Sequence, residues 1–90
     1  MKVSFVNNDV FEDYYEWTIN DKKTAKKIMA LIRDISRDPY DGLGKPEPLK
    51  YELSGYWSRE ITHEHRLVYK VEDNVIEILS CKFHYDKGKG

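Results

Sequence analysis

The sequence has little cysteine and no long apolar run, and each scarcity excludes a class of protein. Cys81 is the one cysteine among 90 residues, so neither an internal disulfide nor a cysteine-based zinc site can form, as is typical of a reducing cytoplasm. No apolar stretch approaches the roughly 20 residues that span a membrane, and the opening residues MKVSFVNND lack the apolar segment of a secretory signal. We therefore expect a cytoplasmic protein without a membrane segment.

The chain also lacks a net excess of charge of either sign. Fifteen lysines and arginines against sixteen acids give a net charge of −1, which argues against holding free nucleic acid by bulk charge. The charges are unevenly spread, because residues 1–21 carry one lysine and five acids, whereas residues 22–37 carry six cations and one acid. Two solvated helix faces would explain this pattern, and so would a basic helix that docks against a polyanion.

The spacing of the apolar residues predicts two helices joined by a short connection. The first covers residues 8–20 and is capped by Asn8, and the second covers about 22–38 after a cap at Asp21. Pro39 ends the second helix, because proline cannot continue the hydrogen-bond pattern of a helix interior.

Four short stretches with apolar and β-branched residues predict strands, and the short connections between the last three predict an antiparallel meander. With 40% hydrophobic and 34% charged residues, the chain has the composition of one small globular domain. We expect an α+β fold in the order β-α-α-β-β-β, with a two-helix hairpin packed on a mainly antiparallel four-stranded sheet. The predicted strands cover residues 2–6, 56–61, 66–71 and 75–83, the domain covers residues 1–85, and residues 86–90 form a flexible tail.

Alternation of side chains along these strands predicts one face rich in cations. The register assumes that Val71 lies opposite Val75 and that Arg66 lies opposite Ile61. One face then has four cations, an exposed tryptophan, a histidine and no acid, while the other is mostly apolar and suits the helices. An ordinary solvated sheet face and an RNA-binding surface both fit that pattern. The residues that carry it are Trp57, Arg59, Arg66, Lys70, Lys82 and His84.

Four segments resemble the YoeB/Txe branch of the RelE toxin superfamily in order and spacing: KPEPLK, LSGYWSREI, EHRLVY and CKFHY. The similarity extends upstream through DYYEW and covers essentially residues 1–85. The resemblance implies a RelE-like fold and a small cytoplasmic toxin that cleaves messenger RNA on the ribosome. It also implies a homodimer and a YefM-like antitoxin that neutralises the toxin.

The same resemblance assigns a role to each matching residue of the site. Glu47 corresponds to the general base, Arg66 to the arginine that contacts the scissile phosphate, His84 to the general acid and Tyr85 to the tyrosine that places the substrate. Lys50 and Arg59 match basic positions that support the phosphate or the RNA. Together with the cation-rich face, this gives a predicted RNA-binding set of Lys50, Trp57, Arg59 and Lys82. The basic second helix gives a predicted ribosome-docking set of Lys22, Lys23, Lys26 and Lys27.

These residue types suit RNA cleavage without a metal or a cofactor. The 2′-hydroxyl of RNA is an internal nucleophile, so a base, an acid and a cation beside the phosphate are sufficient. Glu60 departs from the family pattern, because many relatives have a second basic residue there. His63 and His65 lack a third ligand nearby, and we assign both to a turn. The alternatives are a non-catalytic RelE-fold binding module and a regulatory protein that acts only through protein contacts.

Overall fold

The computed structural model describes residues 1–83. Residues 84–90, which include the predicted site residues His84 and Tyr85 and the predicted tail, lie outside the described part. The elements are β1 (Lys2–Phe5), α1 (Asn8–Asn20), α2 (Lys22–Arg37), β2 (Glu47–Pro48), the short 3₁₀ helix η1 (Tyr51–Leu53), β3 (Trp57–Glu60), β4 (Arg66–Glu72) and β5 (Val75–Ser80).

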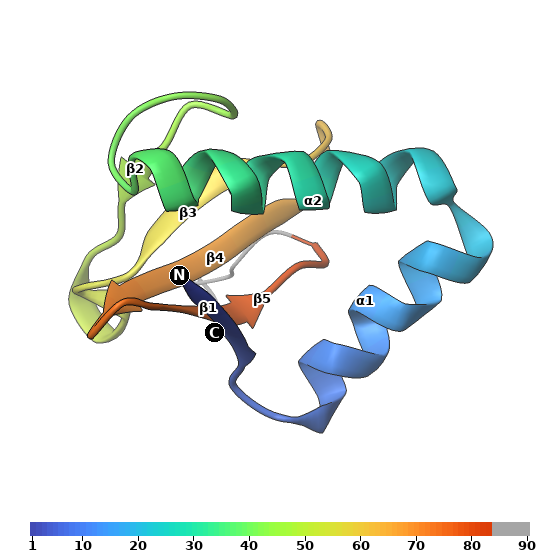
Figure 1. Ribbon diagram of the computed structural model, residues 1–90, viewed down its shortest axis with the longest axis horizontal. Coiled ribbons are helices and arrows are strands. Elements are labelled where there is room, and N and C mark those ends of the chain that lie inside the picture. Colours follow the sequence, from blue (N-terminus) through green and yellow to red (C-terminus); the bar gives the residue numbers. More distant parts are fainter. Residues whose placement is uncertain (84–90) are drawn as a thin grey trace.

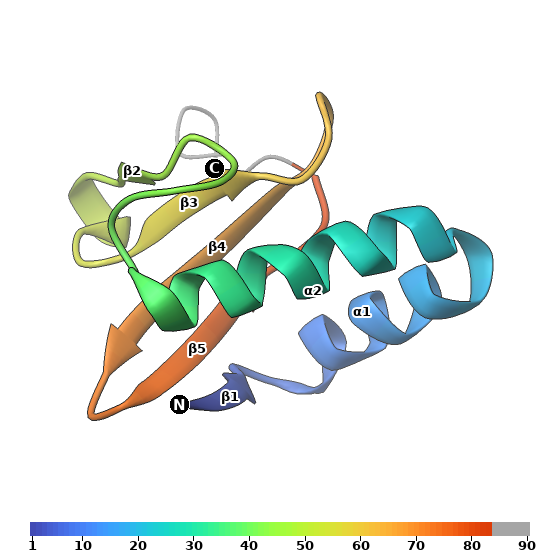
Figure 2. The same cartoon turned by 45° about the horizontal axis from the view of Figure 1, so that its top comes forward.

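The two long helices form a hairpin that covers one face of a mixed sheet (Figures 1 and 2). The five strands lie in the order β1-β5-β4-β3-β2, and β1 pairs in parallel with β5 while the other pairs are antiparallel. The predicted α+β architecture is confirmed. The sheet gains its fifth strand from β2, a two-residue edge strand that the sequence pattern does not show.

Side-chain caps and an apolar stripe explain where the helices lie. Asp21 caps α2 as predicted, accepting hydrogen bonds from the backbone N–H and the hydroxyl of Thr24. The cap of α1 is Asn7 rather than Asn8, because the Asn7 side chain accepts from the N–H of Val10. The buried stripe of α2 consists of Ile28, Leu31, Ile32 and Ile35, and it packs on the sheet. The centre of the core also contains Val10, Leu67, Tyr69, Ile76 and Ile78.

At the turn between β4 and β5, the observed register differs from the predicted one by one residue. Glu72, not Val71, lies opposite Val75. The two residues between them, Asp73 and Asn74, have φ angles of 52° and 63°. A two-residue hairpin turn needs a positive φ at both central positions, and Asp and Asn tolerate that conformation better than most residues. The predicted pairing of Val71 with Val75 was therefore wrong.

The pairing of β3 with β4 also differs from the prediction by one residue. Arg66 lies opposite Glu60 and not opposite Ile61, which belongs to the connecting turn. A bulge between Val68 and Tyr69 shifts the register again along β5. Because a one-residue slip moves a side chain to the other face, the two predicted faces mix residues from both sides of the sheet.

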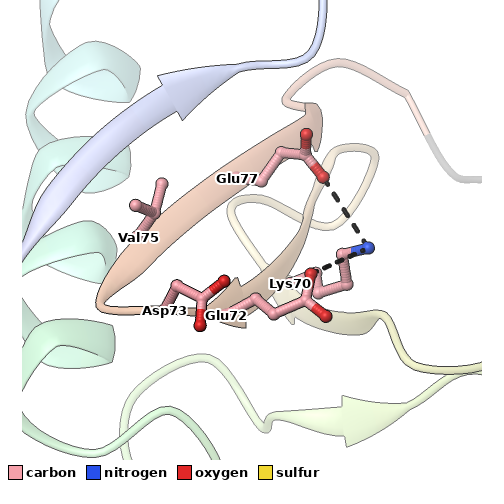
Figure 3. Close-up of a pocket in the computed structure, with 5 residues that line it drawn as sticks. All are labelled: Lys70, Glu72, Asp73, Val75 and Glu77. Carbon is pink, nitrogen blue, oxygen red and sulfur yellow. Dashed lines mark ion pairs between the residues drawn. The ribbon is translucent and has the colours of Figure 1, made fainter.

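The sheet face away from the helices, called the outer face below, carries acids as well as cations. Lys70 lies between Glu72 and Glu77, with its Nζ 3.5 Å and 4.0 Å from their carboxylate oxygens (Figure 3). Trp57 instead packs against the core on the helix side, and Arg59 is buried there. The prediction of one acid-free face is therefore wrong.

Arg59 is buried and holds the loop that follows α2. Its side chain has 0% exposure, and its Nη1 donates to the Asp34 carboxylate at 2.6 Å while its Nε donates to the Tyr69 hydroxyl at 3.1 Å. The structure therefore places Arg59, which the sequence predicts to support the phosphate or the RNA, inside the fold with no exposed surface. The remaining bonds of the guanidinium go to loop carbonyls, at 2.7 Å for Asp38, 3.2 Å for Asp41 and 3.1 Å for Leu43.

The Asp34 carboxylate makes the stability of the fold depend on pH. The N–H of Leu43, then the guanidinium groups of Arg37 and Arg59, hold the pKa of Asp34 well below its usual value. In the unfolded chain that pKa returns to about 3.9. Asp34 therefore stabilises the fold fully above about pH 5, and this contribution is lost as the pH falls toward the lower folded-state pKa.

We expect the stability difference between the wild type and Asp34→Asn to shrink on acidification. Urea midpoints of both proteins at pH 7, 5, 4 and 3 measure this difference directly. Comparing the two proteins cancels the contributions of the other carboxylates. A difference that stays constant across this range would show that the ionised carboxylate does not contribute.

Cys81 is buried on the helix side of the sheet, with 1% exposure. Burial raises the pKa of its thiol to about 12, so the reactive thiolate form is scarce at neutral pH. No helix in residues 1–83 is long and apolar enough to cross a membrane.

Candidate active site on the outer face of the sheet

Three polar residues from three neighbouring strands lie on the outer face. Glu47 of β2 is opposite Ser58 of β3, and Arg66 of β4 is close enough to Ser58 for a hydrogen bond. Glu47 is exposed, Arg66 is half-buried and Ser58 is fully buried. The structure thus brings the predicted base and the predicted phosphate-binding arginine to the same region of one face.

The guanidinium of Arg66 is held at one edge. Its Nε donates to the hydroxyl oxygen of Ser58, which fixes the plane of the group. Its Nη2 is buried and has no hydrogen-bond partner among residues 1–83. Buried donors in native proteins are almost always satisfied, so an orphaned guanidinium nitrogen indicates a site for an acceptor ligand. A phosphate suits this geometry, because guanidinium groups bind two phosphate oxygens with parallel hydrogen bonds.

The last described residues meet Arg66 through the backbone. The N–H of Arg66 donates to the carbonyl oxygen of Phe83 at 3.1 Å, although β5 ends earlier, at Ser80. Phe83 directly precedes His84 in the sequence. The chain that leads to the predicted acid therefore lies beside the start of β4, while His84 and Tyr85 themselves lie outside the described residues.

The other predicted RNA-binding residues lie in different surroundings. Lys50 is exposed and lies two residues after the end of β2. Trp57 is half-buried on the helix side, with its ring 4.9 Å from that of Tyr40. Lys82 is half-buried and its Nζ lies 3.4 Å from a carboxylate oxygen of Glu16. Only Lys50 among these three has a freely exposed side chain near the Glu47 strand, so the set does not form one patch.

The predicted ribosome-docking lysines lie on the exposed side of the first turns of α2. Two of them line a hollow of about 390 Å³ between α2 and the turn that joins β3 to β4. That turn leads directly to Arg66. The four lysines are Lys22, Lys23, Lys26 and Lys27, and the hollow is lined by Lys23, Thr24, Lys27, Ile61 and Thr62.

Two residues with polar contacts at the site were missed by sequence reasoning. Ser58 gave no signal, because an isolated serine in a strand is common and its bond to Arg66 depends on the true register. His65 lies in the turn before β4, as predicted, and nothing in the sequence indicates that its Nδ1 accepts a hydrogen bond from the N–H of Phe83 at 2.7 Å. Within residues 1–83, no group of three His, Cys, Asp or Glu side chains is placed to hold a metal ion.

Comparison with known proteins identifies the chain's relatives. The sequence profile for the YoeB-like toxin of bacterial type II toxin–antitoxin systems matches residues 6–85. The toxin YoeB of Synechocystis sp. is 54% identical over 87 residues, which is 97% of this chain and 100% of that protein. The toxin YoeB of Escherichia coli is 52% identical over 79 residues, which is 88% of this chain and 94% of that protein.

Solved structures agree with the sequence comparison. The YoeB/ParE toxin from Agrobacterium tumefaciens superimposes with a TM-score of 0.90 at 45% identity, covering 94% of this chain and 100% of that one. A YoeB dimer from Staphylococcus aureus superimposes with a TM-score of 0.87 at 52% identity, covering 94% and 98%. The chain is thus a toxin of the bacterial type II toxin–antitoxin class. Within that class, it belongs to the YoeB-like toxin family.

Proposed function

We propose that this toxin is a metal-independent endoribonuclease that cleaves messenger RNA in the decoding site of the ribosome. Family membership supports the toxin assignment, and the unpartnered Nη2 of Arg66 carries the proposal of a phosphate site. The Glu47 carboxylate lies on the same face, two strands away. This arrangement supplies a base and a phosphate-binding cation from rigid strands.

In the proposed reaction, the 2′-oxygen of the RNA attacks the adjacent phosphorus. Glu47 accepts the proton of the 2′-hydroxyl, and Arg66 stabilises the charge that grows on the phosphate oxygens. The bond from phosphorus to the 5′-oxygen breaks, and His84 donates a proton to that leaving oxygen. Tyr85 helps to place the substrate. The products are a 2′,3′-cyclic phosphate, which can open to a 3′-phosphate, and a 5′-hydroxyl.

The ribosome would supply the attraction that the chain's own charge lacks. With a net charge of −1, the protein draws little free RNA by its field. The docking lysines of α2 would instead bind ribosomal RNA, next to the hollow that borders the turn before Arg66. Messenger RNA would then meet the site already positioned, so that proximity replaces bulk attraction.

The proposed protein partners are a second copy and a YefM-like antitoxin. A 52% identical toxin from Staphylococcus aureus has been solved as a dimer, and a 51% identical one as a YoeB–YefM complex. A disordered antitoxin segment with acids and apolar anchors could bind the basic side of α2 and cover the hollow between α2 and the turn before Arg66. Such binding would block RNA entry and would weaken with salt at its charged contacts.

A cleavage assay with programmed ribosomes tests the proposal. We expect messenger RNA in the decoding site to be cut far faster than the same RNA alone, with 5′-hydroxyl ends, and we expect a 2′-deoxy residue at the cut site to prevent cleavage. EDTA should leave cleavage intact under conditions that preserve the ribosomes. Products with 5′-phosphates, or activity lost with EDTA, would contradict the mechanism. Equal rates on free and bound RNA would contradict ribosome dependence, and no cleavage at all would favour a non-catalytic protein.

A further inference from the structure

Two adjacent residues hold both polar groups of the Phe83 backbone. The N–H of Phe83 donates to Nδ1 of His65 at 2.7 Å, and the carbonyl oxygen of Phe83 accepts from the N–H of Arg66 at 3.1 Å. The sheet ladder does not explain these bonds, because β5 ends at Ser80. The chain is therefore fastened a second time, immediately before the residue that we propose as the general acid.

The backbone of Phe83 needs this fastening. Its φ angle is 63°, in the left-handed region that large side chains rarely adopt. Such a conformation persists only where the surroundings hold it in place. The Phe83 side chain is 57% exposed, so burial of its ring contributes little to holding it. The two backbone hydrogen bonds are polar contacts that help to hold Phe83 in this conformation.

His65 is itself fixed in position. Its ring packs edge-on against Trp17, with centroids 4.8 Å apart, and lies 5.4 Å from the ring of Phe83. The indole N–H of Trp17 donates to the carbonyl of Cys81 at 2.9 Å, which ties α1 to the same segment. Because Nδ1 of His65 accepts a hydrogen bond, its proton is on Nε2, which faces Glu64 at 3.8 Å. The imidazole acts here as a neutral acceptor.

We propose that His65 is a positioning residue of the nuclease site. By accepting from the Phe83 N–H, it holds the residue that directly precedes His84 and links that residue to Arg66, its own neighbour in the sequence. The acid and the phosphate-binding cation would then be aligned by one short segment at the start of β4. This inference rests on the proposed function. His65 itself would neither transfer a proton in the reaction nor contact the substrate.

The expected loss of cleavage rate follows from how strongly general acid catalysis depends on position. A well-placed acid contributes about 10²- to 10⁴-fold to a rate, and a displacement of about 1 Å can cost about 10²-fold. Loss of the His65 acceptor should lower the single-turnover cleavage rate by about 10- to 100-fold. The toxin concentration that half-saturates the ribosomes should not change, because the docking lysines lie on α2.

Two substitutions separate the hydrogen bond from the ring packing. His65→Phe keeps an aromatic ring against Trp17 but removes the acceptor. His65→Asn removes the ring but can place its side-chain oxygen near the position of Nδ1. We expect the Phe variant to lose cleavage and the Asn variant to retain most of it. His63→Phe makes the same chemical change at an exposed position of the same turn and should cleave like the wild type.

A double-mutant cycle tests whether His65 acts through His84. If it does, adding His65→Phe to His84→Gln should lower the residual rate by less than about twofold, because the acid is already missing. Amide hydrogen exchange at Phe83 gives a readout independent of catalysis, and its protection should fall in the Phe variant and return in the Asn variant.

These measurements distinguish a failure of the positioning role of His65 from a failure of the proposed function. If the wild type does not cleave RNA, the proposed function fails, and the exchange measurement still tests the contact. If the wild type cleaves and His65→Phe is equally fast, His65 does not position the acid. The same conclusion follows if the Phe and Asn variants are equally impaired, or if the effects of His65→Phe and His84→Gln simply multiply.

Discussion

Replacing Arg59 with leucine is expected to lower the free energy of unfolding by about 3–5 kcal/mol, the usual cost of removing one partner of a buried ion pair. Leucine is apolar and fits a buried site, so the loss comes from the groups left behind. The Asp34 carboxylate, 8% exposed, would lose its buried partner, and three loop carbonyls and the Tyr69 hydroxyl would lose a donor.

Urea denaturation of the wild type and Arg59→Leu measures this loss. Arg33→Leu is the matched control, because it makes the same change on the exposed side of α2 and should shift stability by no more than about 0.5 kcal/mol. Arg59→Lys should not restore the wild-type stability, since one ammonium group cannot reach Tyr69, Asp34 and the loop carbonyls together. If Arg59→Leu were as stable as Arg33→Leu, the buried network would not stabilise the fold.

The hydrogen bonds of Arg59 also affect the candidate active site, because the loop that they hold leads into β2. Gly42 has a φ of 130°, and a Cβ there would lie 2.0 Å from a carboxylate oxygen of Asp34, so a side chain does not fit. The carbonyl of Gly44 accepts from the N–H of Glu60 at 2.7 Å, which joins the loop to β3. From the interior, Arg59 thus holds the loop that leads to Glu47.

The helices were predictable from the sequence because their signals are local. An Asp side chain three residues before Thr24 and a repeat of apolar residues every three to four positions fix α2 within a few neighbouring residues. The cap of α1 was misplaced by one residue between two adjacent asparagines, Asn7 and Asn8, which are equivalent by composition alone.

The sheet faces were not predictable because they depend on register. Two residues with positive φ at the β4–β5 turn change which side chains share a face, and so does one bulge between Val68 and Tyr69. Neither feature has a strong signal in the local sequence. The burial of Arg59 depends on Asp34, 25 positions away. The residues Glu47 and Arg66 were predicted from the family resemblance, while the acid-free face that also pointed to Arg66 was wrong.

Arg66→Lys is expected to lower the single-turnover cleavage rate on ribosomes by about 10²–10³-fold, the cost of losing one well-placed donor to a developing negative charge. The charge is kept, so the loss would come from geometry. In the wild type, Nε donates to Ser58 while Nη2 remains for a ligand. A lysine ammonium is a point charge and cannot hold the serine and present a planar pair of donors to a phosphate.

Two further variants separate geometry from general electrostatics. Ser58→Ala removes the anchor of the Arg66 side chain and should reduce cleavage by a smaller factor than Arg66→Lys, because the guanidinium remains but is no longer fixed. Lys70→Met removes a cation four residues along the same strand and face, where Glu72 and Glu77 already neutralise it, and should leave the rate unchanged. Cleavage by Arg66→Lys at the wild-type rate would show that the fork of the guanidinium is not used. A loss in Lys70→Met as large as that in Arg66→Lys would instead assign the effect to the charge of the face, because Lys70 lies outside the Glu47–Ser58–Arg66 group.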